Sequence, residues 1–149
     1  MPILKIFLDN SALFAGIASS IGAARALLIL GETQNIQLAI SEQVVVETER
    51  AIARKIPTAL SLVRQAILDS KAKIHPDPTL DEIQAYLNWM NDPTDVPILV
   101  AAMKAQVDHL VTLNRRHFLE DANLAQKSGL LMGTPGDALV WVREQLGNQ

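Results

Sequence analysis

The sequence predicts an α/β fold, a three-layer α/β/α sandwich around a mostly parallel sheet of four or five strands. Two observations lead to this prediction. Short apolar, β-branched runs alternate along the chain with longer helical patterns, as in strands joined by crossover helices. The first such run, residues 3–8, has the length of a buried strand and stops at a carboxylate, Asp9. Because ligands bind outside the carboxyl ends of parallel strands, this strand end is a candidate site.

Length and composition favour one domain over residues 1–149. Apolar residues make up 49% of the chain, enough for a core and too many for a disordered protein. The formal net charge of −3 shows no overall basic excess, although a local basic patch can coexist with an acidic site. The chain has no Cys, which excludes disulfides, thiolate metal sites and Cys nucleophiles.

The sequence carries no sign of export or membrane insertion. Its first residues lack a signal-peptide pattern, and no apolar run approaches the ~20 residues needed to span a bilayer. We therefore expect a cytoplasmic protein that makes no contact with a membrane.

The first part of the chain predicts two strands and two helices. Residues 4–8 form the first strand, and the Ala- and Leu-rich segment 21–30 forms a helix ended by Gly31. Residues 36–40 alternate with period two and predict the second strand. Ser41 is then the N-cap of a helix that runs to about residue 55.

The middle of the chain predicts a helical hairpin, a weak strand and a further helix. A helix that begins at Pro57 and runs to about Ser70 forms an αα-hairpin with the preceding helix. Residues 72–75 form a weak strand, and Thr79 caps a helix over residues 80–90.

The last third of the chain continues the alternation of helices and strands. The predicted segments are a helix capped by Thr94 or Asp95 and running to about residue 106, a strand over 107–112, a short or broken helical stretch over 115–127, a strand over 129–133 and a helix over 135–146. Because all these connections are short, we expect one compact domain.

Acidic residues at three places are candidates for chemistry, and each also has a structural explanation. Asp9 fits a turn or a helix cap. Glu47 and Glu49 both flank the apolar stripe of their helix, and periodicity does not choose between them, although we expect Glu49 on a solvated face. Asp95 fits an N-cap, a role that is compatible with metal binding, and Asp92 fits a turn before Pro93.

A polar segment follows the strand predicted over residues 107–112. It contains Asn114, Arg115, Arg116 and His117, and its simplest interpretation is a turn with a solvated basic cluster. For the single His117 we favour a surface or hydrogen-bonded role over that of a base or metal ligand. Asp108 lies at the opposite end of the strand, where we expect it to be structural.

Three blocks of this sequence resemble the PIN domain family. The segment 7–11 is similar to the family's opening strand, which ends in Asp-x-Ser or Asp-x-Asn. Ile40-Ser41 followed by Val44-Val45-Val46-Glu47 resembles its strand–helix junction and the Glu in the helix that follows. The segment 95–102, Asp-Val-Pro-Ile-Leu-Val-Ala-Ala, leads into 107–112 and resembles the family's Asp-x-x-Ile-Leu-x-x-Ala helix and its strand ending in Val-Thr. Residues 134–137 resemble the closing turn.

The resemblance implies a metal-dependent endoribonuclease that hydrolyses RNA phosphodiester bonds. Asp9, Glu47 and Asp95 would be the metal ligands for Mg²⁺ or Mn²⁺, which prefer carboxylate and water oxygens. The fourth acidic position of the family holds Asn114. Some family members have Asn there and place an acid three residues later, where this chain has His117. With no fourth acid by either alignment, we expect a second metal to bind less tightly than the first.

The resemblance also indicates partners. Many PIN domains are the toxin of a VapBC-type toxin–antitoxin pair, so RNA, an antitoxin protein and a second copy of the chain in a homodimer are expected partners. Ser11, Arg115 and Arg116 are the candidate substrate-binding residues, through nonspecific phosphate contacts that depend on salt. The apolar spacing of Leu60, Val63 and Ile67 fits either a partner surface or an ordinary core stripe.

Two other functions remain open. The missing fourth acid is compatible with a catalytically weak or inactive PIN-like module that binds RNA or protein. A receiver-like domain ranks last, because such a domain needs paired acids after its first strand and a phosphoacceptor Asp after a central strand. Here Leu8-Asp9-Asn10 supplies one acid, and the second predicted strand ends in Ile40-Ser41.

Overall fold

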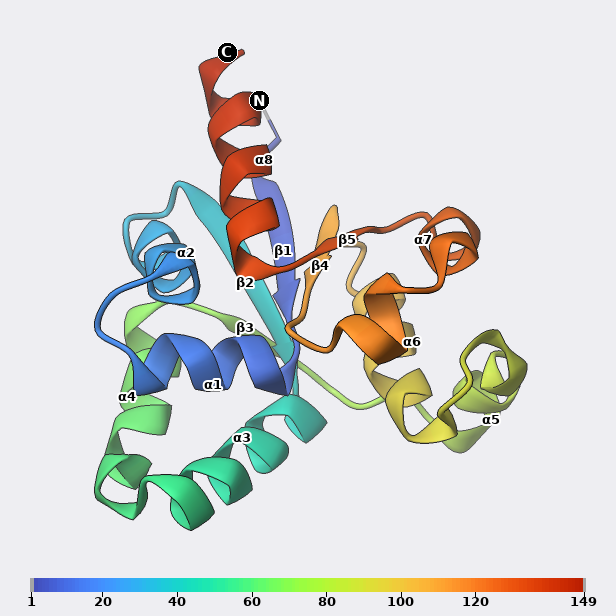
Figure 1. Cartoon of the computed structure of the whole chain (residues 1–149), viewed down its shortest axis with the longest axis horizontal. Coiled ribbons are helices and arrows are strands. Elements are labelled where there is room, and N and C mark those ends of the chain that lie inside the picture. Colours follow the sequence, from blue (N-terminus) through green and yellow to red (C-terminus); the bar gives the residue numbers. More distant parts are fainter. Residues whose placement is uncertain (1, 149) are drawn as a thin grey trace.

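A parallel five-stranded sheet organises the computed structural model, which describes residues 2–148. The strand order is β3–β2–β1–β4–β5, and all neighbours are parallel. The strands are β1 (Leu4–Leu8), β2 (Ile36–Ser41), β3 (Lys73–His75), β4 (His109–Val111) and β5 (Leu131–Gly133). The predicted fold class is therefore confirmed, with β1 at the centre of the sheet (Figure 1). The last two strands are shorter than predicted.

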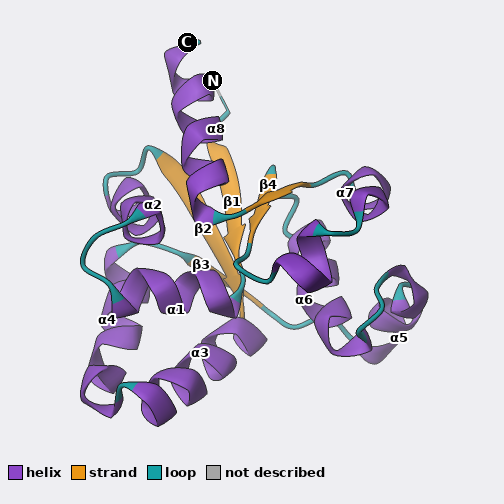
Figure 2. Cartoon of the chain, viewed as in Figure 1, coloured by secondary structure: helices purple, strands orange, loops and turns teal. Residues whose placement is uncertain are grey.

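Helices cover both faces of this sheet (Figure 2). The longer ones are α1 (Asn10–Ala18), α2 (Ala23–Glu32), α3 (Glu42–Lys55), α4 (Leu60–Asp69), α6 (Val96–Lys104) and α8 (Pro135–Gly147). The short α5 (Leu80–Gln84) and α7 (Ala122–Ser128) complete the set. In Figure 1, α1 and α2 lie to one side of the strands, and α6 lies to the other with α5 beyond it.

Side-chain caps fix where several helices begin. Ser41 Oγ accepts a hydrogen bond from Val44 N–H at the start of α3, as predicted. Thr134 and Asp137 form a reciprocal capping box at the start of α8, within the segment that resembles the closing turn of the family. Each cap satisfies a backbone N–H group that has no partner inside its helix.

Helix α1 was not predicted, because its sequence gives little periodic signal. Its apolar residues surround the helix instead of forming one stripe, and Ala12, Leu13 and Ile17 are all buried. Asp9 is its N-cap, which confirms one of the two structural roles considered for this residue. The first strand therefore passes directly into a helix at the candidate site.

The prediction that Gly31 ends its helix is wrong. Helix α2 continues to Glu32, and Gly31 lies inside it, against Leu38 and the Ser70 carbonyl oxygen. The Gly is explained by close packing and not by a left-handed C-cap. The helix also begins at Ala23, after Gly22 with φ of 105°, which is later than predicted.

Several predicted helices are interrupted. The segment 80–90 contains α5 and a 3₁₀ turn, Leu87–Trp89, while Pro57–Ala59 forms a 3₁₀ turn before α4. A 3₁₀ turn, Pro93–Asp95, also precedes α6. The predicted broken stretch consists of a π-helical turn, Arg115–Leu119, followed by α7.

The core lies between the sheet and the two helical layers. Its completely buried large side chains include Phe7, Leu38, Ile52, Leu99 and Leu110. In the αα-hairpin, the spacing of Leu60, Val63 and Ile67 fitted either a partner surface or a core stripe. Val63 and Ile67 belong to the core, whereas Leu60 is 41% exposed. Within residues 2–148, no single helix is long and apolar enough to cross a membrane; α1 and α2 meet that test only as a pair bent by 91°.

Candidate active site

Asp9 stands at the carboxyl end of the central strand and is held by three hydrogen bonds. Its Oδ1 accepts from Ser11 Oγ at 2.6 Å and from Ala12 N–H at 2.9 Å, and its Oδ2 accepts from Thr112 Oγ1 at 2.5 Å. The residue is only 2% exposed. Burial raises the pKa of Asp9, and these hydrogen bonds offset only part of that rise.

Thr112 joins the ends of the two central strands. Strand β4 lies beside β1, with Leu8 opposite Val111, so Asp9 and Thr112 follow paired residues. The buried Thr112 hydroxyl donates to Asp9 and accepts from the N–H of Asn114 at 2.9 Å. The ends of these two strands therefore meet, and one hydroxyl connects them.

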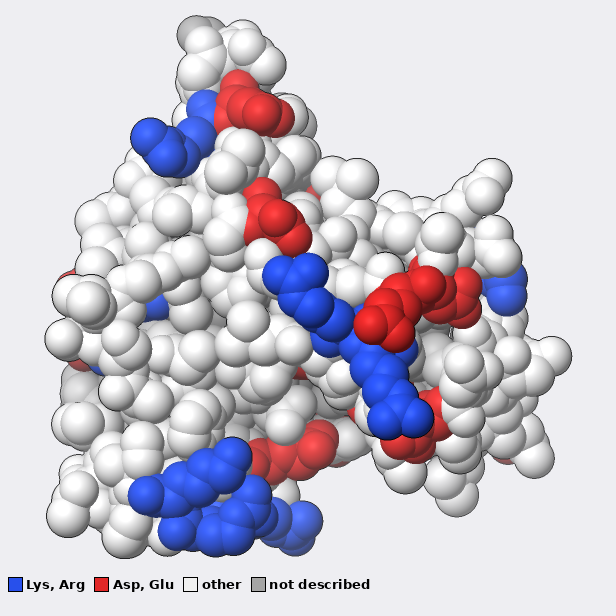
Figure 3. Space-filling model, in the orientation of Figure 1, with Lys and Arg blue, Asp and Glu red and all other residues white. Residues whose placement is uncertain are grey.

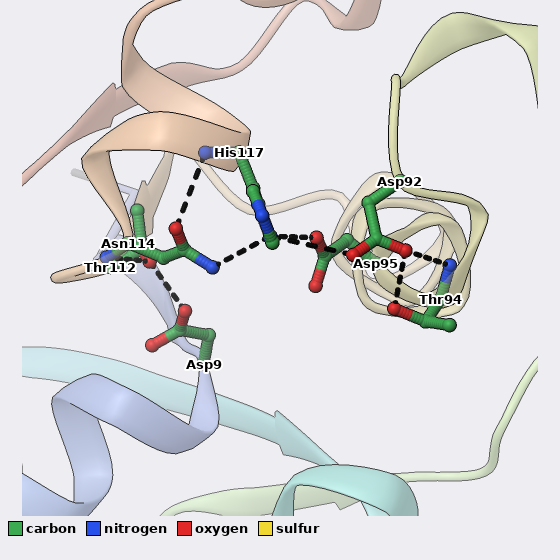
Figure 4. Close-up of polar contacts among 7 residues, drawn as sticks. All are labelled: Asp9, Asp92, Thr94, Asp95, Thr112, Asn114 and His117. Atoms are coloured by element: carbon green, nitrogen blue, oxygen red, sulfur yellow. Dashed lines mark hydrogen bonds and ion pairs between the residues drawn. The ribbon is translucent and has the colours of Figure 1, made fainter.

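Asn114 organises the π-helical turn that follows. Its Oδ1 accepts from the backbone N–H of His117 at 3.2 Å, and its Nδ2 lies 3.0 Å from His117 Nδ1. Both polar atoms of the Asn114 side chain therefore face the same residue. A single turn of π-helix is often found at functional sites, and here it aims the His117 side chain back toward the candidate site (Figure 4).

His117 lies against Asp95 and Asp92 (Figure 4). Its Nδ1 is 2.5 Å from Asp95 Oδ2 and 3.9 Å from Asp92 Oδ2. Burial raises the pKa of Asp95, with the Asp92 and Glu47 charges adding to the rise and His117 opposing it. The pKa of Asp92 is lowered, mainly because the Thr94 hydroxyl donates to its Oδ1.

Glu47 reaches the site from α3. It is half-buried, and its Oε1 accepts from Gln43 Nε2 at 2.8 Å. The Glu47 charge is the smallest of the causes that raise the pKa of Asp95. Glu49, by contrast, pairs with Arg64 at 3.1 Å on the outer side of the αα-hairpin.

The described residues bring three metal-ligating atoms into one compact group. It consists of Asp92, Asp95 and His117, with one ligand atom of each within 4.8 Å of the others. Asp9 and Glu47 lie outside this group. Asp95 is therefore the one predicted metal ligand in this group. Its two neighbours, Asp92 and His117, were not predicted as ligands.

The chemistry of the donors fits a divalent cation. Asp95 Oδ2 is shielded from solvent, and its close polar neighbour is His117 Nδ1 at 2.5 Å. Asp9 Oδ2 accepts one hydrogen bond and retains a second lone pair. Such incompletely satisfied carboxylate oxygens are ligands that Mg²⁺ and Mn²⁺ prefer.

The three candidate substrate-binding residues differ in their surroundings. Ser11 Oγ donates to Asp9 and accepts from Leu113 N–H at 2.9 Å, so its hydroxyl is engaged within the protein. Arg115 and Arg116 are exposed on the π-helical turn. Figure 3 shows a band of basic side chains across this face between acidic patches, and a separate basic group at the bottom of the view.

Three contributors to this site do not emerge from the sequence: Asp92, Thr112 and His117. Asp92 fits a turn residue, and it does accept from Thr94 N–H as such a residue would. Its spacing of three residues from Asp95, within one helical turn, was the available signal. The spacing of three between Asn114 and His117 was a second signal, but the π-helical turn that makes it effective has no clear sequence signature.

The fold and the geometry define a class of protein: a parallel α/β domain with carboxylates gathered near the carboxyl end of its central strand. Comparison with family models refines this class, because the model described as PIN domain matches residues 5–116. The chain belongs to the PIN domain family, as its sequence resemblance indicated, and PIN domains are generally nucleases. Comparison with curated proteins gives no match.

Solved structures share the fold. A protein from Pyrobaculum aerophilum, PAE2754, is 22% identical with a TM-score of 0.64, over 95% of this chain and 90% of that one. The DNA-bound VapBC of Salmonella typhimurium is 19% identical with a TM-score of 0.63, over 89% of this chain and 99% of that one. The sarcin–ricin loop cleaving toxin VapC20 of Mycobacterium tuberculosis is 16% identical with a TM-score of 0.52, over 70% of this chain and 86% of that one. At these identities the likeness concerns the fold alone.

Proposed function

We propose that this chain is a divalent-metal-dependent endoribonuclease that hydrolyses RNA phosphodiester bonds, and that it is the toxin of a VapBC-type pair. The observation that carries the proposal is the continuous series of polar contacts from buried Asp9 through Thr112, Asn114 and His117 to Asp95 (Figure 4). A stable fold has no structural need for so many partly desolvated carboxylates in one place. A nuclease does need them.

In this proposal Asp9, Glu47 and Asp95 hold Mg²⁺ or Mn²⁺. When bound, the ion supplies Lewis acidity and lowers the pKa of a water molecule that attacks phosphorus. Thr112 orients Asp9 by donating to its Oδ2. Asn114 acts in catalysis by positioning: its two polar atoms orient His117, and its backbone N–H fixes Thr112.

RNA binding needs positive charge around this acidic centre. Arg115 and Arg116 project from the π-helical turn next to Asn114 and are exposed. Exposed Arg50 and Arg54 lie on α3, the helix that also carries Glu47. Contacts from these guanidinium groups to phosphate would be independent of base sequence and would weaken with salt.

An antitoxin and a second copy of the chain complete the proposal. The VapBC neighbour is a toxin–antitoxin complex that was solved bound to DNA, which supports an antitoxin partner here. Leu62 and Leu68 on α4 are 53% and 71% exposed, and such apolar area suits an interface. A cytoplasmic location without membrane contact is part of the same proposal.

The test is cleavage of a labelled RNA panel with Mn²⁺, with Mg²⁺ and with EDTA. We expect metal-dependent cleavage by the parent protein. Asp9→Asn combined with Asp95→Asn should reduce the rate at least about a hundredfold, since metal-ion catalysis supplies several kcal/mol. Asp69→Asn, which changes an exposed carboxylate on α4, is the matched control. Equal cleavage by the double variant and the parent would contradict the proposal.

The second candidate is a catalytically weak or inactive PIN-like module that binds RNA or protein. Asn114 favours it, because this neutral side chain stands at the fourth acidic position and is occupied with His117. RNA binding that survives in EDTA, together with no cleavage under any metal condition, would support this candidate over the nuclease.

A further inference from the structure

We propose that Gln43 and Asp77 are positioning residues for Glu47, and that they set how tightly this carboxylate holds an ion. The inference deepens the proposed function and rests on it for the role of Glu47 as a metal ligand. It gives a task to the segment Pro76-Asp77-Pro78 and to a Gln in the first turn of α3.

The segment after β3 is tied to the start of α3. Ser41 lies opposite His75 in the register of β2 and β3, and both strands end at this pair. Two residues further on, the two segments meet, because Asp77 Oδ1 accepts from the backbone N–H of Gln43 at 2.8 Å. In return, Glu42 Oε1 accepts from the backbone N–H of Asp77 at 3.0 Å. This reciprocal pair of hydrogen bonds holds the first turn of α3, which begins where β2 ends (Figure 1).

The segment that carries Asp77 is stiff by its sequence. Pro76 and Pro78 flank Asp77, and each proline ring fixes its own φ and disfavours a helical conformation in the preceding residue. Because proline has no N–H group, Asp77 supplies the only backbone donor of this tripeptide, and Glu42 accepts from it. The first turn of α3 therefore rests against a rigid support.

Gln43 extends this support to the candidate site. It lies four residues before Glu47 on the same face of α3, and its Nε2 donates to Glu47 Oε1 at 2.8 Å. Within residues 2–148 the Glu47 carboxylate has no other hydrogen bond and no ion pair, although exposed Arg50 follows it by one turn. Gln43 thus holds Oε1 and leaves Oε2 free for an ion.

A second Gln–carboxylate pair shows what is particular about this one. On α4, Gln65 Nε2 donates to Asp69 Oδ1 at 2.8 Å, also across four residues, but both residues are exposed. Gln43 and Glu47 are half-buried, and Asp77 anchors the backbone of Gln43. The Gln65 pair is ordinary stabilisation of a helix surface. The Gln43 pair joins a support from a neighbouring strand to a proposed metal ligand.

A carboxylate that is already held binds a cation more tightly than a mobile one. Glu has a long side chain, and ordering it as a ligand costs conformational entropy. Asp9 is fixed by three hydrogen bonds, whereas Gln43 provides the one hydrogen bond to Glu47 found among the described residues. Hydrogen-bond partners behind metal ligands orient them and raise metal affinity. Gln43 therefore has this effect on Glu47.

The experiment is isothermal titration calorimetry of the whole protein with Mn²⁺ at neutral pH. Gln43→Ala removes the donor to Glu47 and keeps the backbone N–H that Asp77 accepts. Its Kd for Mn²⁺ should rise about tenfold or more. Gln65→Ala is the matched control and should leave the Kd unchanged, because it removes the same type of bond outside the site. The urea midpoints of both variants should stay near that of the parent, since Ala is the best helix former.

Two substitutions of Asp77 separate its position from its charge. Asp77→Ala and Asp77→Asn both remove the negative charge, but Asn keeps an oxygen that accepts from the N–H of Gln43. We expect Asp77→Ala to raise the Kd for Mn²⁺ roughly threefold or more, since it acts through Gln43. Asp77→Asn should bind Mn²⁺ as the parent does.

The outcomes separate this inference from the proposed function. A Kd for Mn²⁺ that is unchanged in Gln43→Ala would overturn the inference, and equal losses in the two Asp77 variants would overturn the role of Asp77. Both results leave a metal-dependent nuclease intact. Mn²⁺ binding with the expected order of variants but without RNA cleavage would refute the nuclease alone, whereas a parent protein that binds no Mn²⁺ would contradict both.

Discussion

At the residue scale, Asp9 shows how a carboxylate can be held in place and yet disfavoured as an anion. Three hydrogen bonds fix its orientation, but only 2% of the residue is exposed, and burial dominates its acidity. Asp95 repeats the pattern, because burial raises its pKa although His117 lies beside its Oδ2. Both residues carry a desolvation penalty that a bound cation would reduce.

The penalty at Asp9 has a defined pH dependence. Its pKa is raised in the folded protein, so the native state binds a proton more tightly than the unfolded chain does. The contribution of protonated Asp9 to stability is complete below the ordinary Asp pKa of 3.8, and it is lost as the pH rises through the raised pKa of the folded state. At neutral pH without metal, the ionised Asp9 therefore destabilises the fold.

Asp9→Asn should therefore raise the urea midpoint of the protein in EDTA at neutral pH. Asn keeps an oxygen that can accept from Ala12, which preserves the cap of α1. The difference from the parent should shrink as the pH falls through the raised pKa of Asp9, where the carboxylate takes up its proton. Urea unfolding at several pH values measures this. A loss of stability that is equal at every pH would contradict this role of Asp9.

The sequence marked Asp9 and Asp95 as candidates, since strand ends and helix starts are recognisable, whereas the resemblance to the family selected Glu47 as the third. It did not allow Asp92 and His117 to be selected. Asp92 has an adequate structural role beside Pro93, and the orientation of His117 depends on a π-helical turn capped by Asn114. That geometry arises from tertiary packing and not from local propensity.

At the element scale, predictions succeeded where a cap or a regular period marked an element. Ser41 and the apolar stripe of α3 gave the correct helix, Glu42–Lys55. Helix α1 was missed because apolar residues surround it. Gly31 was misplaced because Gly is used both to end helices and to allow close contacts, and a single sequence does not distinguish these uses.

The position of α2 on the sheet depends on Gly31. A Cβ at this residue would lie 2.6 Å from the Ser70 carbonyl oxygen and 2.7 Å from Leu38 Cδ1. Gly31→Ala should lower the free energy of unfolding by about 1–3 kcal/mol, the usual effect of overpacking. Urea denaturation measures the change.

Gly147→Ala at the end of α8 is the control for this helix contact, since a Cβ at Gly147 would meet nothing within 4 Å and α8 ends there. Its stability should equal or slightly exceed that of the parent because Ala is the better helix former. A Gly31→Ala protein as stable as Gly147→Ala would show that α2 does not need the close approach.

At the scale of the whole molecule, a parallel sheet explains how residues distant in sequence come together. Strand β1 lies between β2 and β4, so the ends of the first and fourth strands meet, and α3 leaves from the end of β2 beside them. The parallel sheet could be predicted from the alternation of strands and helices, whereas the strand order came from the structure. The exact contacts followed only from the packed structure.

The central claim is that the carboxylates of Asp9, Glu47 and Asp95 form a metal centre. An anomalous difference map from a crystal soaked in Mn²⁺ near neutral pH tests it most directly. We expect a peak at bonding distance, about 2.2 Å, from oxygens of all three side chains. Well-defined side chains without a peak between them at saturating Mn²⁺ would contradict the claim.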